Sequence, residues 1–170
     1  SFMIRKDKIN YYLDLAEVSL ERGTCLRRNY GAVIVKNDEV ISTGYTGAPR
    51  GRVNCSDFGY CARQALNIKS GEKYELCRSV HAEQNAIISA ARKDTLGATL
   101  YLVGKENETG EYVADASPCA MCKRVIINAG IEKVVARIDK ERYSVTYVDD
   151  YISYDEVLEE KVKPILNKNN

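Results

Sequence analysis

The sequence predicts an α/β layered fold with a mixed sheet. Runs rich in β-branched and aromatic residues alternate with stretches of helical periodicity, and two adjacent strand-like runs open the alternation. The chain has 170 residues, of which 45% are apolar, and this is enough for one domain with a real core. We therefore expect a single domain over residues 1–170.

The first part of the chain supplies one helix and a pair of strands. The apolar residues that recur at helical spacing over residues 5–22 are Ile9, Leu13, Ala16 and Leu20. Gly23 is expected to end this helix. Residues 30–35 and 39–45 are β-rich runs joined by a polar turn at residues 36–38, which is typical of a hairpin. Gly31 and Ala32 are small enough to let a ligand approach the first strand.

The next segment is predicted to be mostly irregular. Residues 44–51 read GYTGAPRG, and their glycines and proline favour a loop that is free to wrap a ligand. A plain surface connection is the alternative. Residues 52–78 have weak periodicity, so we expect only a short helix near residues 62–68.

The remaining chain alternates helices with strands. The expected strands are residues 98–103, 131–136 and 144–148. The expected helices are residues 79–92, 119–128 and a last one that runs through about 158–162. Ser79 and Ser117 are candidate caps, and Ser153 with Glu156 forms a capping box before Pro164. Residues 104–116 indicate an inserted turn or hairpin.

Four residues in two motifs form a candidate metal site. His81 and Glu83 form a His-x-Glu motif, and Cys119 and Cys122 belong to a later Pro-Cys-x-x-Cys motif. His81 is the only histidine of the chain. One imidazole and two thiolates leave the fourth position of tetrahedral zinc open, as in zinc sites that do chemistry. Both cysteines would lie on one face of a helix start, where backbone amides stabilise thiolates. We therefore expect His81, Cys119 and Cys122 to bind one catalytic zinc ion.

Glu83 is the candidate proton shuttle of this site. It follows His81 by two residues and could reach a zinc-bound water from the same helix start. Both motifs together are the signature of zinc-dependent nucleobase deaminases. The alternative is a structural zinc knuckle with an incidental glutamate. A closed structural site, however, needs a fourth protein ligand, and the chain has no second histidine.

Charge and composition argue against several classes of function. The net charge is +1, from 25 basic and 24 acidic residues, so no overall basic field attracts nucleic acid or a membrane surface. No stretch is apolar enough to span a membrane, and the N-terminus lacks the apolar core of a signal peptide, so we expect a cytoplasmic protein. The cysteines therefore indicate metal ligands and reduced thiols before disulfides. A second, structural zinc is an open alternative for the remaining cysteines, which are Cys25, Cys55, Cys61 and Cys77.

With these residues, the chain resembles the cytidine and deoxycytidylate deaminase family, and within it the deoxycytidylate (dCMP) deaminases most. The matching segments are residues 24–28, 31–35, 44–51, 81–87 and 119–130. The resemblance implies a three-layer α/β/α cytidine deaminase-like fold with a five-stranded mixed sheet. It places a catalytic core at about residues 6–137 and a C-terminal strand and helix at residues 138–170. Relatives assemble as homo-oligomers, often hexamers, so a homo-oligomer is expected.

The resemblance also implies a reaction, the hydrolytic deamination of dCMP to dUMP with release of ammonia, in pyrimidine deoxynucleotide metabolism. A water activated at the zinc would attack C4 of cytosine while Glu83 protonates N3 and then the departing ammonia. Arg27 matches an arginine that lies near the 5′-phosphate in this family. Thr46 stands where the family usually has an asparagine that contacts the sugar. Arginines are also concentrated on the two loops expected to border the pocket, namely Arg27, Arg28, Arg50 and Arg52.

Other functions remain open. A tRNA adenosine deaminase shares the zinc site, but the near-neutral charge and Ser117, where that family commonly has glutamate, argue against it. Deaminases of free cytidine or deoxycytidine usually have cysteine at the position of His81. A non-catalytic binding protein that retains zinc would have no need of Glu83.

Overall fold

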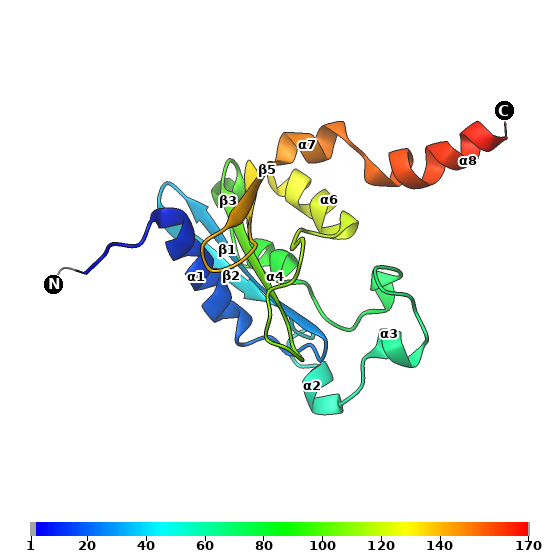
Figure 1. Ribbon diagram of the computed structural model, residues 1–170, viewed down its shortest axis with the longest axis horizontal. Coiled ribbons are helices and arrows are strands. Elements are labelled where there is room, and N and C mark those ends of the chain that lie inside the picture. The colour runs from blue at the N-terminus through cyan, green and yellow to red at the C-terminus, as the bar shows by residue number, and fades with distance from the viewer. Residues whose placement is uncertain (1–2, 170) are drawn as a thin grey trace.

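The structure, a computed structural model, describes residues 3–169 (Figure 1). Its strands form one sheet of five, in the order β2-β1-β3-β4-β5. The strands are β1 (Arg28–Lys36), β2 (Glu39–Tyr45), β3 (Thr99–Glu106), β4 (Lys133–Arg137) and β5 (Tyr143–Tyr147). β3 and β4 are parallel, whereas the other neighbouring pairs are antiparallel. The predicted α/β fold with a five-stranded mixed sheet is therefore confirmed.

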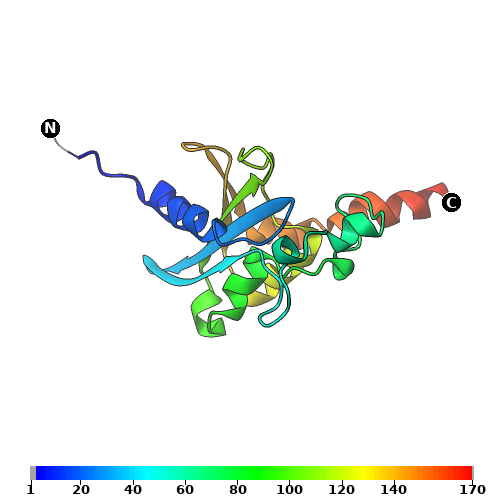
Figure 2. The same ribbon diagram turned by 90° about the horizontal axis from the view of Figure 1, so that it is seen from below.

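Helix α1 (Lys8–Leu20) covers one face of the sheet (Figure 2). The core on this face consists of Tyr12, Leu13, Ala16 and Leu20 packed on Val33, Val35, Tyr101, Val103 and Val135. The helix begins at Lys8 and not at residue 5, because the Asp7 side chain accepts a hydrogen bond from the Asn10 amide and caps it. A side chain at Gly31 would clash with the Ala16 carbonyl oxygen. The small size of Gly31 thus serves helix packing, and the expected ligand approach was wrong.

Helices α4 (Ala82–Ile88), α6 (Ala120–Ala129) and α7 (Val148–Ser153) lie on the opposite face. The core there includes Ala82, Ala86, Ile126, Ala129 and Val148 packed on Ala32, Ile34, Leu100, Leu102 and Val134. A side chain at Gly44 would clash with the Ala82 carbonyl oxygen, so glycine lets the start of α4 lie directly on β2. The three-layer arrangement expected from the resemblance is therefore present.

The predicted helix over residues 79–92 is two helices, α4 and α5 (Arg92–Thr95). Ser79 does not cap the first one, because Val80 pairs with Gly47 in an isolated bridge and His81 takes the N-cap position. Cys119, and not Ser117, takes the N-cap position of α6. The predicted metal ligands His81 and Cys119 therefore lie at the N-terminal ends of these helices.

Between β2 and α4 the chain makes an excursion away from the sheet, residues 46–80 (Figure 1). It contains the short helices α2 (Cys55–Phe58), α3 (Ala62–Ala65) and η1 (Tyr74–Leu76). The short helix predicted near residues 62–68 is present as α3 but ends at Ala65, and α2 and η1 were not predicted. Each is a single turn, too short to leave a periodic pattern in the sequence.

The inserted segment after β3 and the C-terminal helices complete the fold. Lys105 bridges Tyr112, so residues 104–116 fold back as expected. The predicted capping box is wrong, because Ser153 ends α7 and the Asp155 carboxylate caps the next helical segment by accepting from the Val157 and Leu158 amides.

That segment runs through a π-helical stretch, η2 (Leu158–Val162), into α8 (Lys163–Lys168), which projects from the body of the protein (Figure 1). Pro164 lies in the first turn of α8 and does not end the helix as predicted. Within residues 3–169, no helix combines the length and the apolar character that a membrane crossing requires.

Candidate active site

The starts of α4 and α6 bring the three predicted metal ligands together. His81 and Cys119 are the N-cap residues of these helices, and Cys122 lies in the first turn of α6. The Nδ1 atom of His81 is 3.7 Å from the Cys119 sulfur and 3.3 Å from the Cys122 sulfur. All three ligand atoms lie within 4.8 Å of one another. The arrangement is a cluster of one imidazole and two thiols at two helix N-termini.

Backbone and side-chain contacts fix His81 from several directions. The Val80 amide donates to the Gly47 carbonyl at 2.7 Å, and the Gly47 amide donates to the Val80 carbonyl at 3.2 Å. The amide of His81 donates to the Gln84 side-chain oxygen at 3.0 Å. The Tyr74 ring meets the imidazole edge-on, with 5.4 Å between the ring centres. The GYTGAPRG segment therefore holds the residue before His81 through Gly47.

The donor set fits a zinc ion. Tetrahedral zinc with bonds of about 2.0 Å to nitrogen and about 2.3 Å to sulfur holds these ligand atoms about 3.5 Å apart. The two distances between His81 and the cysteine sulfurs, 3.7 and 3.3 Å, lie on either side of this value. Two thiolates would neutralise the charge of Zn²⁺, and three protein ligands would leave one position open for a reacting molecule.

Contacts among the cluster residues shift the pKa of each of them. Hydrogen bonding to Cys122 and then to His81 lowers the pKa of Cys119 to about 4, although burial opposes this. Burial lowers the pKa of His81, but hydrogen bonds to Cys119 and Cys77 outweigh it and raise the pKa to about 10. The Cys119 thiolate and burial raise the pKa of Cys122. A metal ion that binds here would displace the protons of His81 and Cys122.

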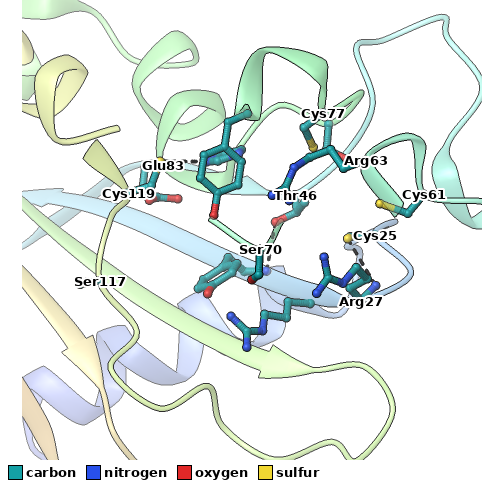
Figure 3. A pocket seen from close by; sticks show the side chains of 15 residues that line it. Cys25, Arg27, Thr46, Cys61, Arg63, Ser70, Cys77, Glu83, Ser117 and Cys119 are labelled. Atoms are coloured by element: carbon teal, nitrogen blue, oxygen red, sulfur yellow. Dashed lines mark hydrogen bonds between the residues drawn. The ribbon is translucent and has the colours of Figure 1, made fainter. Parts of the chain in front are cut away.

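Glu83 lies in the first turn of α4 and is 5% exposed. Its side chain lies next to Cys119 at one end of a pocket (Figure 3). Burial raises the pKa of its carboxyl group. Carboxyl groups with pKa values shifted in this way cluster at functional sites, where they act as general acids and bases.

The pocket is a cavity of about 160 Å³ that extends from the His81 cluster to a group of arginines. Figure 3 shows Glu83 and Cys119 on one side, Arg27 on the other and Thr46 between them. Arg28 and Arg63 line the same cavity. The cavity thus joins an acidic, metal-suited end to a basic end.

Hydroxyl-bearing residues line this cavity, among them Thr46 and Ser79. Thr46, which was predicted to bind substrate, is 7% exposed, and its hydroxyl oxygen accepts from the Tyr30 amide at 3.1 Å. No acceptor for the hydroxyl proton of Thr46 is found among residues 3–169, so this proton could be donated to a ligand. The Ser79 hydroxyl also lines the cavity, and it is buried without a hydrogen-bond partner among residues 3–169. A polar ligand could satisfy it.

Arg27 is half-buried at the basic end of the cavity, on a loop that other segments hold in place. Asn29 bonds both the amide and the carbonyl of Cys25, at 2.9 and 3.0 Å. Asn107, from the inserted segment, donates its amide to the Arg27 carbonyl at 2.8 Å. The insertion therefore supports the loop that carries Arg27.

The other predicted arginines behave differently. Arg28 lines the cavity, but its Nε atom forms an ion pair with Glu106 at 2.8 Å. Arg50 and Arg52 are exposed and do not line the cavity, so the prediction that they border the pocket was wrong. They follow the Gly47 bridge, which turns the chain away from the site.

Three of the remaining cysteines, Cys25, Cys61 and Cys77, line the cavity, whereas Cys55 is buried with its sulfur 3.7 Å from Arg78 Nη1. All four are free thiols. Within residues 3–169, no three of them come close enough together to hold a metal ion. The structure therefore gives no support for the alternative of a second, structural zinc.

The side chains that line the cavity and that sequence reasoning missed include Arg63, Tyr74 and Ser79. Arg63 and Tyr74 belong to the excursion, where the sequence carries no motif. Ser79 was assigned to a helix cap. Its position two residues before His81 was the only available signal of a role in the site.

Comparison with known proteins agrees with this geometry. A sequence profile of the cytidine and deoxycytidylate deaminase zinc-binding region matches residues 6–138. The deoxycytidylate deaminase of Mycobacterium phage D29 is 37% identical over 138 residues, which cover 78% of this chain and 96% of the phage protein. The deoxycytidylate deaminase of Schizosaccharomyces pombe is 34% identical over 127 residues, or 74% of this chain. The chain spans only 35% of the length of that yeast protein.

A solved structure shares the fold. The dCMP deaminase of the cyanophage S-TIM5, crystallised in complex with dCMP and dUMP, superposes with a TM-score of 0.53 at 24% identity. The superposition covers 79% of this chain and 84% of the phage enzyme. The profile match spans most of the chain and includes His81, Glu83, Cys119 and Cys122. The chain therefore belongs to the cytidine and deoxycytidylate deaminase family.

Proposed function

We propose that this protein is a zinc-dependent hydrolase that converts dCMP and water to dUMP and ammonia, a step of pyrimidine deoxynucleotide metabolism. The observation that carries the proposal is one cavity with a His/Cys cluster and a buried carboxyl group at one end and arginines at the other. A nucleoside monophosphate has the matching polarity, with an uncharged base at one end and a phosphate of about two negative charges at the other. The names of the phage and yeast relatives support the same substrate.

In this proposal His81, Cys119 and Cys122 hold the zinc ion. When bound, zinc supplies an activated water, because coordination lowers the pKa of water to about 7. Glu83 would take a proton from the attacking water and deliver it to N3 of cytosine as C4 is attacked. Glu83 would then carry the second proton of that water, from the hydroxyl group formed at C4, to the amino nitrogen, which leaves as ammonia. Because Glu83 is 5% exposed, bulk water does not compete for these protons.

The other end of the cavity selects the nucleotide. Arg27 is half-buried, lines the cavity and forms no ion pair within the described part of the chain. We propose that it binds the 5′-phosphate, for which a guanidinium group is suited. Thr46 lies between the two ends and is proposed to contact the sugar. A nucleoside without phosphate would leave the basic end of the cavity unused.

Ammonia release from a panel of substrates tests the proposal. Purified zinc-loaded protein would be assayed with dCMP, CMP, deoxycytidine, cytosine and tRNA. We expect the highest kcat/KM for dCMP. Faster turnover of deoxycytidine would contradict the nucleotide assignment, and ammonia from tRNA alone would assign the site to adenosine in a polynucleotide.

A further inference from the structure

We propose that Arg63, which the excursion supplies, is a specificity-determining residue that binds the 5′-phosphate of the substrate together with Arg27. The inference rests on the proposed function, because it concerns the same cavity and the same substrate. It assigns a role to a segment, residues 46–80, that carries none of the three ligands predicted for the catalytic zinc.

The first observation is a buried positive charge without a negative partner. Arg63 is 7% exposed and lines the cavity. None of the ion pairs found within residues 3–169 includes it. Burial of a guanidinium without an anion is costly, and an anionic ligand in the cavity would compensate for it.

The second observation is that the Arg63 side chain is already held in place. Its Nε atom donates to the Glu72 carbonyl at 3.1 Å, and its Nη2 atom donates to the Lys69 carbonyl at 3.0 Å. No hydrogen bond from Nη1 is found to the residues that the structure describes. Little side-chain entropy would therefore be lost when the remaining donors bind an oxyanion.

The third observation places Arg63 relative to the metal-suited end. Its guanidinium carbon lies 4.6 Å from the centre of the Tyr74 ring, and that ring is 5.4 Å from the imidazole of His81. Figure 3 shows the Arg63 side chain directed into the pocket, on a different wall from Arg27. The Tyr74 ring therefore lies between the Arg63 guanidinium and the His81 cluster, at which the base would react. In a nucleotide the sugar likewise lies between the base and the phosphate, so a base at the cluster would have its phosphate some distance away, as Arg63 is.

The neighbouring arginines are less suited to this role. Arg28 is exposed and is paired with Glu106. Arg52 is exposed and does not line the cavity. Arg63 is the arginine of the cavity that is both buried and free of a carboxylate.

The test compares Arg63→Gln with Arg63→Lys, and uses Arg52→Gln as the matched control at an exposed arginine. Steady-state kinetics with dCMP and deoxycytidine would be measured on the zinc-loaded full chain, and calorimetry would measure binding of dUMP and deoxyuridine. Loss of a charge-assisted contact should lower kcat/KM for dCMP about tenfold or more, mainly through KM. Deoxycytidine kinetics and zinc content should not change, Arg63→Lys should retain part of the dCMP preference, and Arg52→Gln should resemble the wild type.

Two outcomes would overturn the inference. If Arg63→Gln weakens dCMP and deoxycytidine equally, the side chain only holds the excursion through Lys69 and Glu72. If dCMP kinetics do not change, Arg63 does not contact the phosphate. Should the glutamine variant fail to fold, Arg63→Lys decides the question, because an unchanged ratio of dUMP to deoxyuridine affinity would refute the contact. A wild type that prefers deoxycytidine would instead refute the proposed function itself.

Discussion

Replacing Glu83 with glutamine should separate catalysis from metal binding and from stability. The amide has the same number of heavy atoms as the carboxyl group, so Glu83→Gln leaves no cavity around a side chain that is 5% exposed. The three ligand atoms of the cluster belong to other residues. Zinc content should therefore equal that of the wild type, and stability should not fall, because a buried carboxylate is replaced by a neutral group.

Activity, in contrast, should fall steeply. A general acid or base contributes about 10²- to 10⁴-fold to the rate, or roughly 3 to 5 kcal/mol of activation free energy. Glutamine cannot carry a proton, and with the carboxyl group gone bulk water has little access to this buried position. We therefore expect kcat to decrease by about 10²-fold at least, and toward about 10⁴-fold if the proton transfers limit turnover.

The assay would combine kcat for dCMP with zinc content and thermal unfolding. Glu75→Gln, the same change at an exposed glutamate of the excursion, is the matched control and should behave as the wild type. A Glu83→Gln protein with full zinc and near-normal kcat would refute the proton-shuttle role. Loss of zinc together with activity would instead mean that Glu83 supports the metal site.

Three further outcomes are expected. Cys119→Ala should lose both zinc and activity in metal analysis and turnover assays, and retention of both would exclude Cys119 as a ligand. Arg27→Ala should raise the KM for dCMP by about tenfold and leave deoxycytidine unchanged, whereas equal weakening would argue against a phosphate contact. Arg137, 1% exposed, bonds Asp14 and Glu17 at 2.8 and 3.2 Å, and Arg137→Met should lower stability by about 3 kcal/mol in urea unfolding at neutral pH. Burial raises the pKa of both carboxyl groups, but hydrogen bonds outweigh it. Hydrogen bonds from Lys6 and Arg137 lower the pKa of Asp14 below its ordinary value of 3.8. Hydrogen bonds from Lys140, Tyr112 and Arg137 lower the pKa of Glu17 below its ordinary value of 4.5. The two carboxylates therefore stabilise the fold fully above pH values of 3.8 and 4.5, and this stabilisation is lost as the pH falls through their lower folded-state pKa values. The free energy of unfolding of the variant should therefore depend less steeply on pH in this acid range than that of the wild type. An unchanged slope of unfolding free energy against pH would contradict this.

The sequence predicted the structure correctly where neighbouring residues determine it. The hairpin was predicted by the polar turn at residues 36–38, and Asn37 and Asp38 adopt the left-handed φ values of 52° and 61° that such residues tolerate. The spacing of Leu13, Ala16 and Leu20 predicted the buried face of α1. The deaminase motif likewise named the residues that the structure gathers at two helix starts.

Some of the failures depend on contacts between distant parts of the chain, and others on local choices of helix cap. Ser79 has the chemistry of a cap, but the bridge from Val80 to Gly47 delays the helix until His81. Ser153 was preferred over Asp155 because the sequence does not show where α7 ends. Arg63 could not be distinguished from a solvated arginine, because its burial depends on the tertiary path of the excursion.

A zinc titration of metal-free protein, with dUMP formation from dCMP as the readout, tests the central claim most directly. If His81, Cys119 and Cys122 form the one catalytic zinc site, activity should be absent without zinc, rise linearly and stop rising at one equivalent per chain. Full dCMP deaminase activity in the metal-free protein, or no activity at any zinc content, would contradict the account.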